Sequence, residues 1–445
     1  MKELEKSDLK QKLFGGKRRI LSIFLLGCLL GACLLSWFGL LDNDMPVLAG
    51  PKKVSQNPVI YLRETYASTD VNVVAYSHQT GEELWTKSSQ YTHTDYLQRS
   101  NGLSYVLDGE VIYYISKCKL YSVNATTGQT IWEQDLYRNG QTFCYGKVLL
   151  DKAFNRIYVV GTVSTEAIQE IPTEPGEMPL RQLPSTSEPR LLAFQTSTGN
   201  QLWQNNTIGY SVFEGMFISM APFVVNNGFI YTTQSPFNTT ADDRKLIAIS
   251  GENGAILWKD KRVDEEIQSL EAVNGVVYTL TAELSEDREH FERFTLAALQ
   301  NGKAIWSRPF KTVAQSSLMI ANNRIFAQSF LLQKDGSYRV QLHGYNITTG
   351  KEEVSRDLGS AGSTASSAMQ TDHTSIYMTF DRQHIKAIET ETGNVLWTSA
   401  HFENIGNVLV EGDKIIFLMR TKTRETFLVA LDSTTGQTAW QQPLP

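Results

Sequence analysis

The stretch "NATTGQTIW" at residues 124–132 returns almost unchanged as "DSTTGQTAW" at residues 432–440. Six further copies occur: "SHQTGEELW" (77–85), "QTSTGNQLW" (195–203), "SGENGAILW" (250–258), "LQNGKAIW" (299–306), "NITTGKEEV" (346–354) and "ETETGNVLW" (389–397). Self-similarity at a period of about 40–50 residues is typical of folds that are built from copies of one unit. The eight copies therefore decide the fold class.

Each copy has the composition of a tight turn followed by a strand. Small polar residues lead to a glycine, which can take the positive φ that a hairpin turn demands. The glycines are Gly81, Gly128, Gly199, Gly254, Gly302, Gly350, Gly393 and Gly436. Seven copies place tryptophan four residues later, at Trp85, Trp132, Trp203, Trp258, Trp306, Trp397 and Trp440, whereas the sixth has Val354.

Before each turn lies a β-rich run in which one position is always small. These residues are Ala75, Ser122, Ala193, Ala248, Ala297, Gly344, Ala387 and Ala430. A small position that accompanies a tryptophan in nearly every unit predicts complementary volumes where neighbouring units pack.

A second recurring run, such as "VIYYI" from Val111 or "SIYMT" from Ser375, precedes each of these segments. Most of these runs follow an Asn, Asp or Gly turn signal and another short apolar run, so each unit contains about four strands. The sequence therefore predicts an all-β protein, an eight-bladed β-propeller of four-stranded blades over residues 58–445. Its weak point is the first blade, whose innermost strand must come from residues 45–56 or be missing.

The N-terminal region has a different character. Residues 20–41, "ILSIFLLGCLLGACLLSWFGLL", contain no charge and follow Lys17, Arg18 and Arg19. This length is sufficient for a transmembrane helix, and the positive-inside rule predicts a cytoplasmic tail (1–19), a linker (42–57) and an extracytoplasmic propeller on a single-pass cell-membrane protein. Two alternatives stay open, a cleaved signal peptide and a lipoprotein attached at Cys33, which ends "LGAC".

These repeats resemble those of the pyrroloquinoline-quinone (PQQ) family of β-propellers, over the chain from about Pro58 to Pro445. In that family the glycine and tryptophan dock one blade on the next, which implies the same role for the glycines and tryptophans named above. Val354 departs from this pattern, so we expect its junction to be weaker or differently filled.

The family contains enzymes and non-enzymes. Its alcohol and glucose dehydrogenases hold PQQ and Ca²⁺ over the central axis beside a catalytic carboxylate, and several have a disulfide between adjacent cysteines. This chain has no adjacent cysteines and mostly short repeats, and it looks closer to the outer-membrane-protein assembly lipoprotein, a scaffold that binds no quinone. The resemblance implies a protein-binding or assembly scaffold without cofactor, and the alternative is a PQQ-dependent oxidoreductase that would need PQQ and Ca²⁺.

Independent chemical signals are few. A formal net charge of −6 gives no basic footprint for nucleic acid. Hydrolase and phosphate-loop motifs do not occur, and no histidine pair has a zinc motif's spacing; we predict no catalytic, cofactor or metal residues. The histidines, interpreted as surface or turn residues, are His78, His93, His290, His343, His373, His384 and His401. Cys118 and Cys144 could form a disulfide in an extracytoplasmic compartment.

One insertion interrupts the repeats at residues 163–189, "VSTEAIQEIPTEPGEMPLRQLPSTSEP". Its five prolines prevent the continuation of a central strand, so we predict a loop that projects from its blade. The loop is either a tolerated surface insertion or a contact site for partners. Other envelope or extracytoplasmic proteins are the partners that a membrane-anchored scaffold implies.

Overall fold

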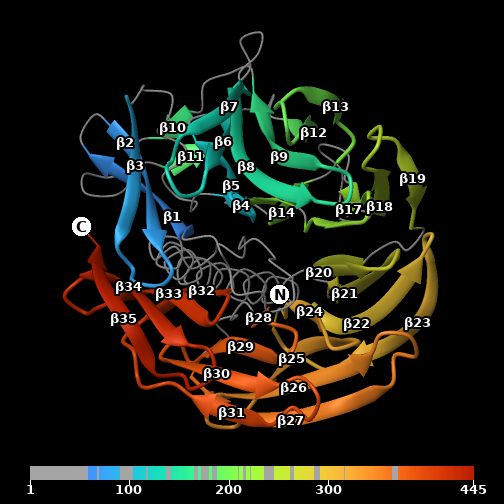
Figure 1. Cartoon of the computed structure of the whole chain (residues 1–445). Coiled ribbons are helices and arrows are strands. Elements are labelled where there is room, and N and C mark those ends of the chain that lie inside the picture. Colours follow the sequence, from blue (N-terminus) through green and yellow to red (C-terminus); the bar gives the residue numbers. More distant parts are fainter. Residues whose placement is uncertain are drawn as a thin grey trace, which may run out of the picture.

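The computed structural model describes residues 59–67, 70–90, 104–116, 119–136, 142–164, 169–171, 180–182, 188–208, 210–213, 217–220, 222–234, 245–260, 265–284, 291–314, 316–362 and 369–444. These residues form an all-β propeller, with the sheets arranged as blades around a central axis (Figure 1). Seven blades have four antiparallel strands each, and within each blade the strands follow chain order from the axis outwards. Two separate two-stranded sheets, described below, do not belong to the blades.

The first three of these blades are β4 (Tyr105–Asp108), β5 (Val111–Ser116), β6 (Lys119–Asn124) and β7 (Thr130–Asp135); β8 (Thr142–Asp151), β9 (Arg156–Ser164), β12 (Glu188–Gln195) and β13 (Gln201–Asn205); and β16 (Val224–Asn226), β17 (Phe229–Gln234), β18 (Lys245–Ser250) and β19 (Ile256–Lys259). The next two are β20 (Glu265–Val273), β21 (Val276–Leu284), β22 (Phe291–Gln300) and β23 (Lys303–Phe310); and β24 (Leu318–Ala321), β25 (Arg324–Leu332), β26 (Tyr338–Asn346) and β27 (Glu352–Ala361). The last two are β28 (Gln370–Thr371), β29 (Ser375–Phe380), β30 (His384–Glu389) and β31 (Val395–Thr398); and β32 (Ile405–Glu411), β33 (Lys414–Arg420), β34 (Thr426–Asp432) and β35 (Thr438–Leu444).

The prediction of eight four-stranded blades is wrong. The first repeat forms a three-stranded sheet of β1 (Val59–Ala67), β2 (Asp70–Ser77) and β3 (Glu83–Gln90), and within the described part of the chain β1 pairs only with β2. The physical reason lies in the sequence before Val59, which has prolines and lysines where the other repeats have a short apolar run. The sheet lies between the first and last four-stranded blades (Figure 1).

The predicted transmembrane segment, residues 20–41, lies outside the described residues, as do the tail and the linker. Where the structure is described, it contains no helix with the length and apolarity needed to cross a membrane. Cys118 also lies outside the described residues, so the predicted disulfide stays a prediction.

The repeated nonapeptide is a side-chain-capped turn. In the copy that begins at Asn124, the side-chain Oδ1 accepts hydrogen bonds from the backbone N–H groups of Thr126 and Thr127, at 3.0 and 2.9 Å. Gly128 closes the turn with φ at 69° and donates its N–H to the Asn124 carbonyl. Asn tolerates and caps such turns because its amide imitates a backbone group. The same geometry recurs at Asp432, so the two matching stretches are copies of one structural turn.

The small residue before each turn lies in a row of three side chains across one face of a blade. In the blade of β4 to β7, Ser122 pairs with Tyr113 on one side and with Trp132 on the other. A small central side chain lets the two aromatic rings approach, with centroids 5.9 Å apart. Tyrosine–tryptophan pairs at 5.8 to 6.1 Å recur in four other blades. The small residue and the tryptophan that the sequence predicted to be complementary are therefore neighbours within one blade, and not only across the junction between two blades.

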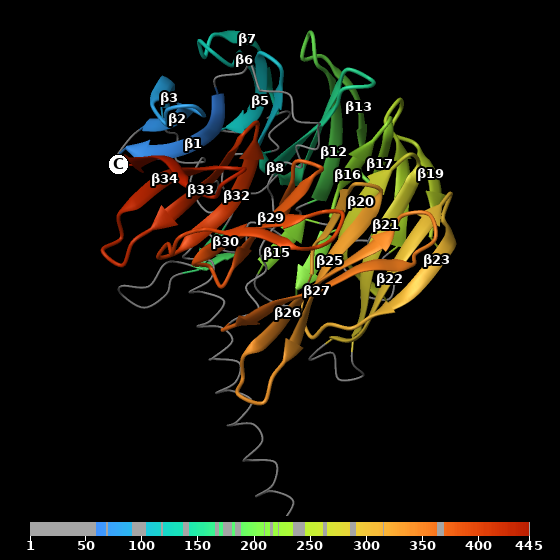
Figure 2. The same ribbon diagram turned by 60° about the horizontal axis from the view of Figure 1, so that its bottom comes forward.

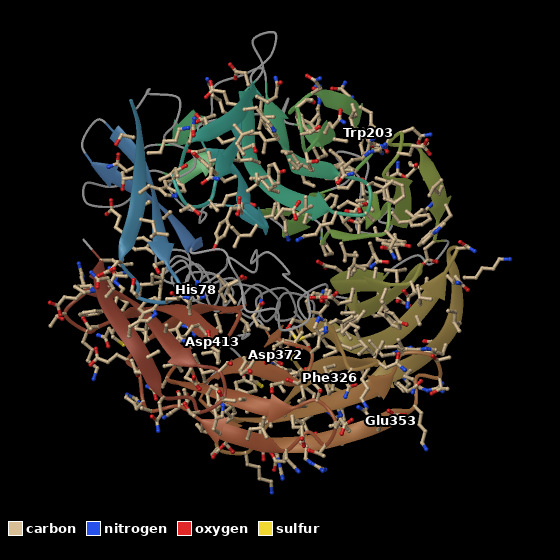
Figure 3. All side chains as sticks on the ribbon, in the orientation of Figure 1. His78, Trp203, Phe326, Glu353, Asp372 and Asp413 are labelled. Carbon is tan, nitrogen blue, oxygen red and sulfur yellow. The ribbon has the colours of Figure 1, made fainter. Side chains whose placement is uncertain are left out.

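The tryptophan also contacts the glycine of the following repeat. A Cβ added at Gly350 would lie 2.5 Å from the Trp306 ring, and five other tryptophans approach the next glycine equally closely, at 2.4 to 2.7 Å from an added Cβ. Six indole N–H groups donate to the carbonyl three residues before that glycine, and the acceptors are Ala125, Thr196, Gly251, Ile347, Ser433 and His78. Figure 3 shows Trp203 near the periphery, between two blades.

This contact also closes the ring. Trp440 in β35 packs on Gly81, and its indole donates to the His78 carbonyl at 2.8 Å. The two partners are 362 residues apart in the chain. The three-stranded sheet is thereby joined to the last blade by side chains, in the same manner as consecutive blades.

Two junctions differ from the pattern. The fifth repeat has a two-residue turn of Asn301 and Gly302, and the residue opposite Trp306 is Ala298 rather than the expected Ala297. The shorter turn shifts the register by one residue. At the same turn Trp258 approaches Gly302 less closely, at 3.1 Å from an added Cβ.

At the second exception, Val354 packs on Gly393 together with Arg356. The Thr390 carbonyl, which a tryptophan would use, accepts instead from Arg324 Nη1 at 3.3 Å. The Arg324 guanidinium also pairs with Glu353 at 2.9 Å, and Glu353 lies at the outer rim in Figure 3. The junction is differently filled, which is one of the two outcomes expected from sequence.

Candidate functional site

The order of the strands divides the chain connections between two faces of the ring. Turns from first to second strand and from third to fourth strand lie on one face, which we call the turn face. Turns from second to third strand and the links between blades lie on the other, the loop face. On the turn face every connection between described strands is two to five residues long.

The loop face has all the long connections. The longest of them span residues 91–104, 165–187, 206–223 and 235–244. Figure 2 shows the ring from a different side, with the β25–β26 turn of this face at the bottom of the view. Long loops on a rigid scaffold are the usual carriers of binding sites, so the loop face is the candidate functional site.

The proline-rich insertion is one of these connections, between β9 and β12. It is not entirely a loop, because β10 (Gln169–Ile171) and β11 (Leu180–Gln182) pair as a small antiparallel sheet. A second hairpin, β14 (Tyr210–Phe213) with β15 (Phe217–Met220), lies in the link that leaves the same blade. This blade therefore has two extra hairpins on the loop face.

Exposed apolar side chains give a second signal. One group recurs in the outermost strands directly before the tryptophan: Leu84, Ile131, Leu202, Leu257, Ile305 and Leu396. Since these follow the repeat, they are a consequence of the fold. Val313 and Leu332, exposed by 55% and 59%, belong to no repeat position, and both lie on the loop face.

Backbone contacts hold these two residues in place. The Val313 N–H donates to the Phe330 carbonyl at 3.0 Å, and the Phe330 N–H donates to Thr312 Oγ1 at 3.2 Å. Val313 thus lies beside Phe330 of β25. Leu332 follows two residues later in the same strand, so its side chain is on the same face of the strand as that of Phe330. We call these two exposed apolar residues, on neighbouring segments of the loop face, the Val313–Leu332 site.

A half-buried carboxyl lies near the axis. Glu271 is in β20, and burial raises its pKa to about 8, although the charge of Lys147 in β8 opposes the shift. β8 and β20 are innermost strands that contact the two sides of β16. A carboxyl with a strongly raised pKa inside a fold can be a functional group, and it can also be a structural residue.

The proline-rich insertion predicted from sequence lies on the loop face, but none of the repeat glycines and tryptophans does. The glycines are in turns of the turn face, and the tryptophans are on the outer strands at the blade junctions. Sequence reasoning missed Val313 and Leu332, since a single exposed apolar residue has no distinguishing pattern. In the described residues, no group of three or more His, Cys, Asp or Glu side chains is arranged to hold a metal ion.

Taken together, the repeated sheets and the tryptophan–glycine junctions define a propeller of the PQQ-like class. The family model described as "Outer membrane protein assembly factor BamB" matches residues 49–177 and 292–445. This match covers more than half of the chain, which belongs to that family. No curated protein matches the sequence.

Solved structures agree with the fold at low sequence identity. BamB from Moraxella catarrhalis is 13% identical, with 80% of this chain and 91% of that chain covered and a TM-score of 0.43. The dihydro-heme d1 dehydrogenase NirN is 11% identical, with 90% and 75% covered and a TM-score of 0.52. The quinohemoprotein alcohol dehydrogenase from Comamonas testosteroni is 11% identical, with 89% and 74% covered and a TM-score of 0.48. Of these likenesses, the one to NirN supports the fold, and at this identity it supports nothing beyond the fold.

Proposed function

We propose that the protein is a binding or assembly scaffold whose loop face contacts other envelope proteins. The observation that carries this proposal is the segregation of the connections, with short turns on one face and every long connection on the other. A catalytic site requires a convergent set of reactive groups, whereas a scaffold requires a rigid ring and an adaptable face. Membership of the BamB family supports an envelope setting.

The Val313–Leu332 site is the proposed apolar centre of the contact. Rigid apolar residues lose little conformational entropy on binding, and central apolar groups dominate the energy of most interfaces. The proline-rich insertion and the β14–β15 hairpin would add contacts around it. The location outside the cytoplasm stays a prediction from the sequence of residues 17–41.

A site-specific photo-cross-linker tests the proposal. We expect a probe at Leu332 to form cross-links to envelope proteins, and a probe at Leu257 to form few. Leu257 is the matched control, because it is 49% exposed and lies on an outer strand. Equal cross-linking at the two positions would refute the loop-face assignment.

The insertion can be tested separately. Residues Val163 and Glu188 are paired across β9 and β12, so residues 165–187 can be replaced by Asn-Gly without breaking either strand. We expect an unchanged melting temperature and weaker capture of envelope proteins. Unchanged capture would remove the insertion from the binding surface.

A PQQ-dependent oxidoreductase is the second candidate, and the half-buried Glu271 carboxyl near the axis, with its raised pKa, favours it. PQQ and Ca²⁺ added to the purified protein should then give a bound-quinone absorption spectrum and dye reduction that Glu271→Gln abolishes. The scaffold proposal expects neither signal, with or without the substitution.

A further inference from the structure

Two histidines that are 17 positions apart in the sequence meet on the loop face. His384 is the first residue of β30, and His401 lies in the link between β31 and β32. Their ring centroids are 5.4 Å apart, with an angle of 66° between the ring planes. Sequence reasoning interpreted both as isolated surface or turn residues, since their spacing matches no metal motif.

Four backbone-anchored hydrogen bonds hold the two segments together. The Phe402 N–H donates to the Gln383 carbonyl at 2.8 Å, and the Ile405 N–H donates to the Arg382 carbonyl at 2.9 Å. Two more bonds join Ser399 and Ile385. The Ser399 N–H donates to the Ile385 carbonyl at 2.8 Å, and the Ile385 N–H donates to Ser399 Oγ at 2.9 Å. The relative position of the two histidines is therefore set by the backbone on both sides of each ring.

A carboxylate orients the first ring. Asp381 Oδ1 lies 3.0 Å from His384 Nδ1, and the same oxygen accepts from the Gln383 N–H at 3.1 Å. A carboxylate at Nδ1 favours the tautomer with its proton there, which leaves the Nε2 lone pair free as a ligand. The His384 side chain is 28% exposed, so its ring is in contact with solvent.

The second ring can adapt. His401 is exposed, and neither of its ring nitrogens has a hydrogen bond among the described residues. Its side chain can turn a nitrogen towards His384 Nε2 without breaking another contact. One ring is thus fixed and the other is free to complete a site.

The spacing agrees with shared coordination. A Zn–N bond of about 2.0–2.1 Å places the centroid of an imidazole about 3.2 Å from the ion. Two such rings at a tetrahedral angle have centroids about 5.2 Å apart, close to the 5.4 Å of this pair. Imidazole nitrogens suit Zn²⁺, Ni²⁺ and Cu²⁺ better than Ca²⁺ or Mg²⁺.

We infer that His384 and His401 form a two-nitrogen site for a divalent cation of the zinc, nickel and copper class, with Asp381 as the residue that orients His384. Water fills the remaining coordination positions, because the described residues offer no group of three or more ligands. The site lies on the loop face but does not depend on the scaffold function.

Calorimetric titration of the purified full-length protein with ZnCl₂ tests the inference. We expect one site, with His384→Gln and His401→Gln each weakening it at least tenfold. Asp381→Asn keeps the turn, since Asn also accepts from the Gln383 N–H and tolerates the positive φ of 54° at this position. The Asp381→Asn variant should bind Zn²⁺ about 10-fold or more weakly, as is usual when the residue that orients a metal-binding histidine is changed.

His373→Asn is the matched control. His373 precedes β29 of the same blade, but it lies on the turn face, and Asn tolerates its φ of 74°. This variant should bind Zn²⁺ like the wild type. Electron paramagnetic resonance with Cu²⁺ gives a second readout, with coupling to two nitrogens in the wild type and to one in each Gln variant. Wild-type affinity in both Gln variants, or coupling to fewer than two nitrogens in the wild type, would overturn the inference.

Discussion

The junction between Trp306 and Gly350 allows a quantitative test of how the blades hold together. Gly350 has a φ of 65°, and the three atoms nearest to an added Cβ all belong to the Trp306 ring, at 2.5 to 2.9 Å. Gly350→Ala therefore has two costs: about 1–2 kcal/mol for the left-handed backbone and about 1–3 kcal/mol for overpacking against the ring. The sum is about 2–5 kcal/mol.

Trp306→Ala removes the other partner. The side chain is 7% exposed, and its indole donates to the Ile347 carbonyl at 3.0 Å. Loss of a buried tryptophan costs about 3–5 kcal/mol. In this background Gly350→Ala meets no ring, so only the backbone cost of about 1–2 kcal/mol is left. The double mutant should thus be more stable than the sum of the single changes by about 1–3 kcal/mol.

Guanidinium unfolding of the four proteins measures this coupling, provided that the m-value is constant. Gly275→Ala is the control, because Gly275 has a φ of 76° and nothing within 4 Å of an added Cβ. It should lose only about 1–2 kcal/mol in the wild type and in the Trp306→Ala background alike. Strict additivity of Gly350→Ala and Trp306→Ala would refute the docking role of this contact.

Two further predictions concern charged groups. Arg324→Ala removes the hydrogen bond to the Thr390 carbonyl and the ion pair with Glu353, so it should lower the free energy of unfolding by about 1–2 kcal/mol in the same assay. A loss below about 0.3 kcal/mol would mean that the arginine does not replace the missing tryptophan. Burial raises the pKa of Glu271 from 4.5 to about 8, so the stability that its protonated form provides is fully present below about pH 4.5 and is lost as the pH rises from there through 8. Glu271→Gln should therefore raise the melting temperature relative to the wild type more at pH 9 than at pH 5. The exposed control Glu252→Gln should show no such difference. An equal effect of Glu271→Gln at both pH values would contradict the raised pKa.

The sequence by itself determined the repeating unit. The turn that Gly128 closes, the small residue at Ser122 and the tryptophan at Trp132 act within about ten residues of one another, and local interactions of this kind are encoded directly in a short motif. Repetition then implies the class of fold, because only stacked units can bury the exposed faces. The family followed from the same motif.

Tertiary structure decided what depends on distant segments. The number of four-stranded blades depends on whether a strand pairs with β1, and the register opposite Trp306 depends on the length of a single turn. Arg324 reaches the next blade only because Val354 leaves the carbonyl at Thr390 without an indole. A one-dimensional pattern does not show that an arginine replaces an indole, since the partners of Arg324 lie 29 and 66 residues away in the chain.

The candidate site shows the same limit more strongly. The loop face gathers connections from every blade, and its apolar site joins a link between blades to β25 through a backbone hydrogen bond. His384 and His401 likewise come together through the bonds between a turn and the following link. Each of these residues is unremarkable in its own stretch of sequence, because its significance arises from neighbours that folding brings to it.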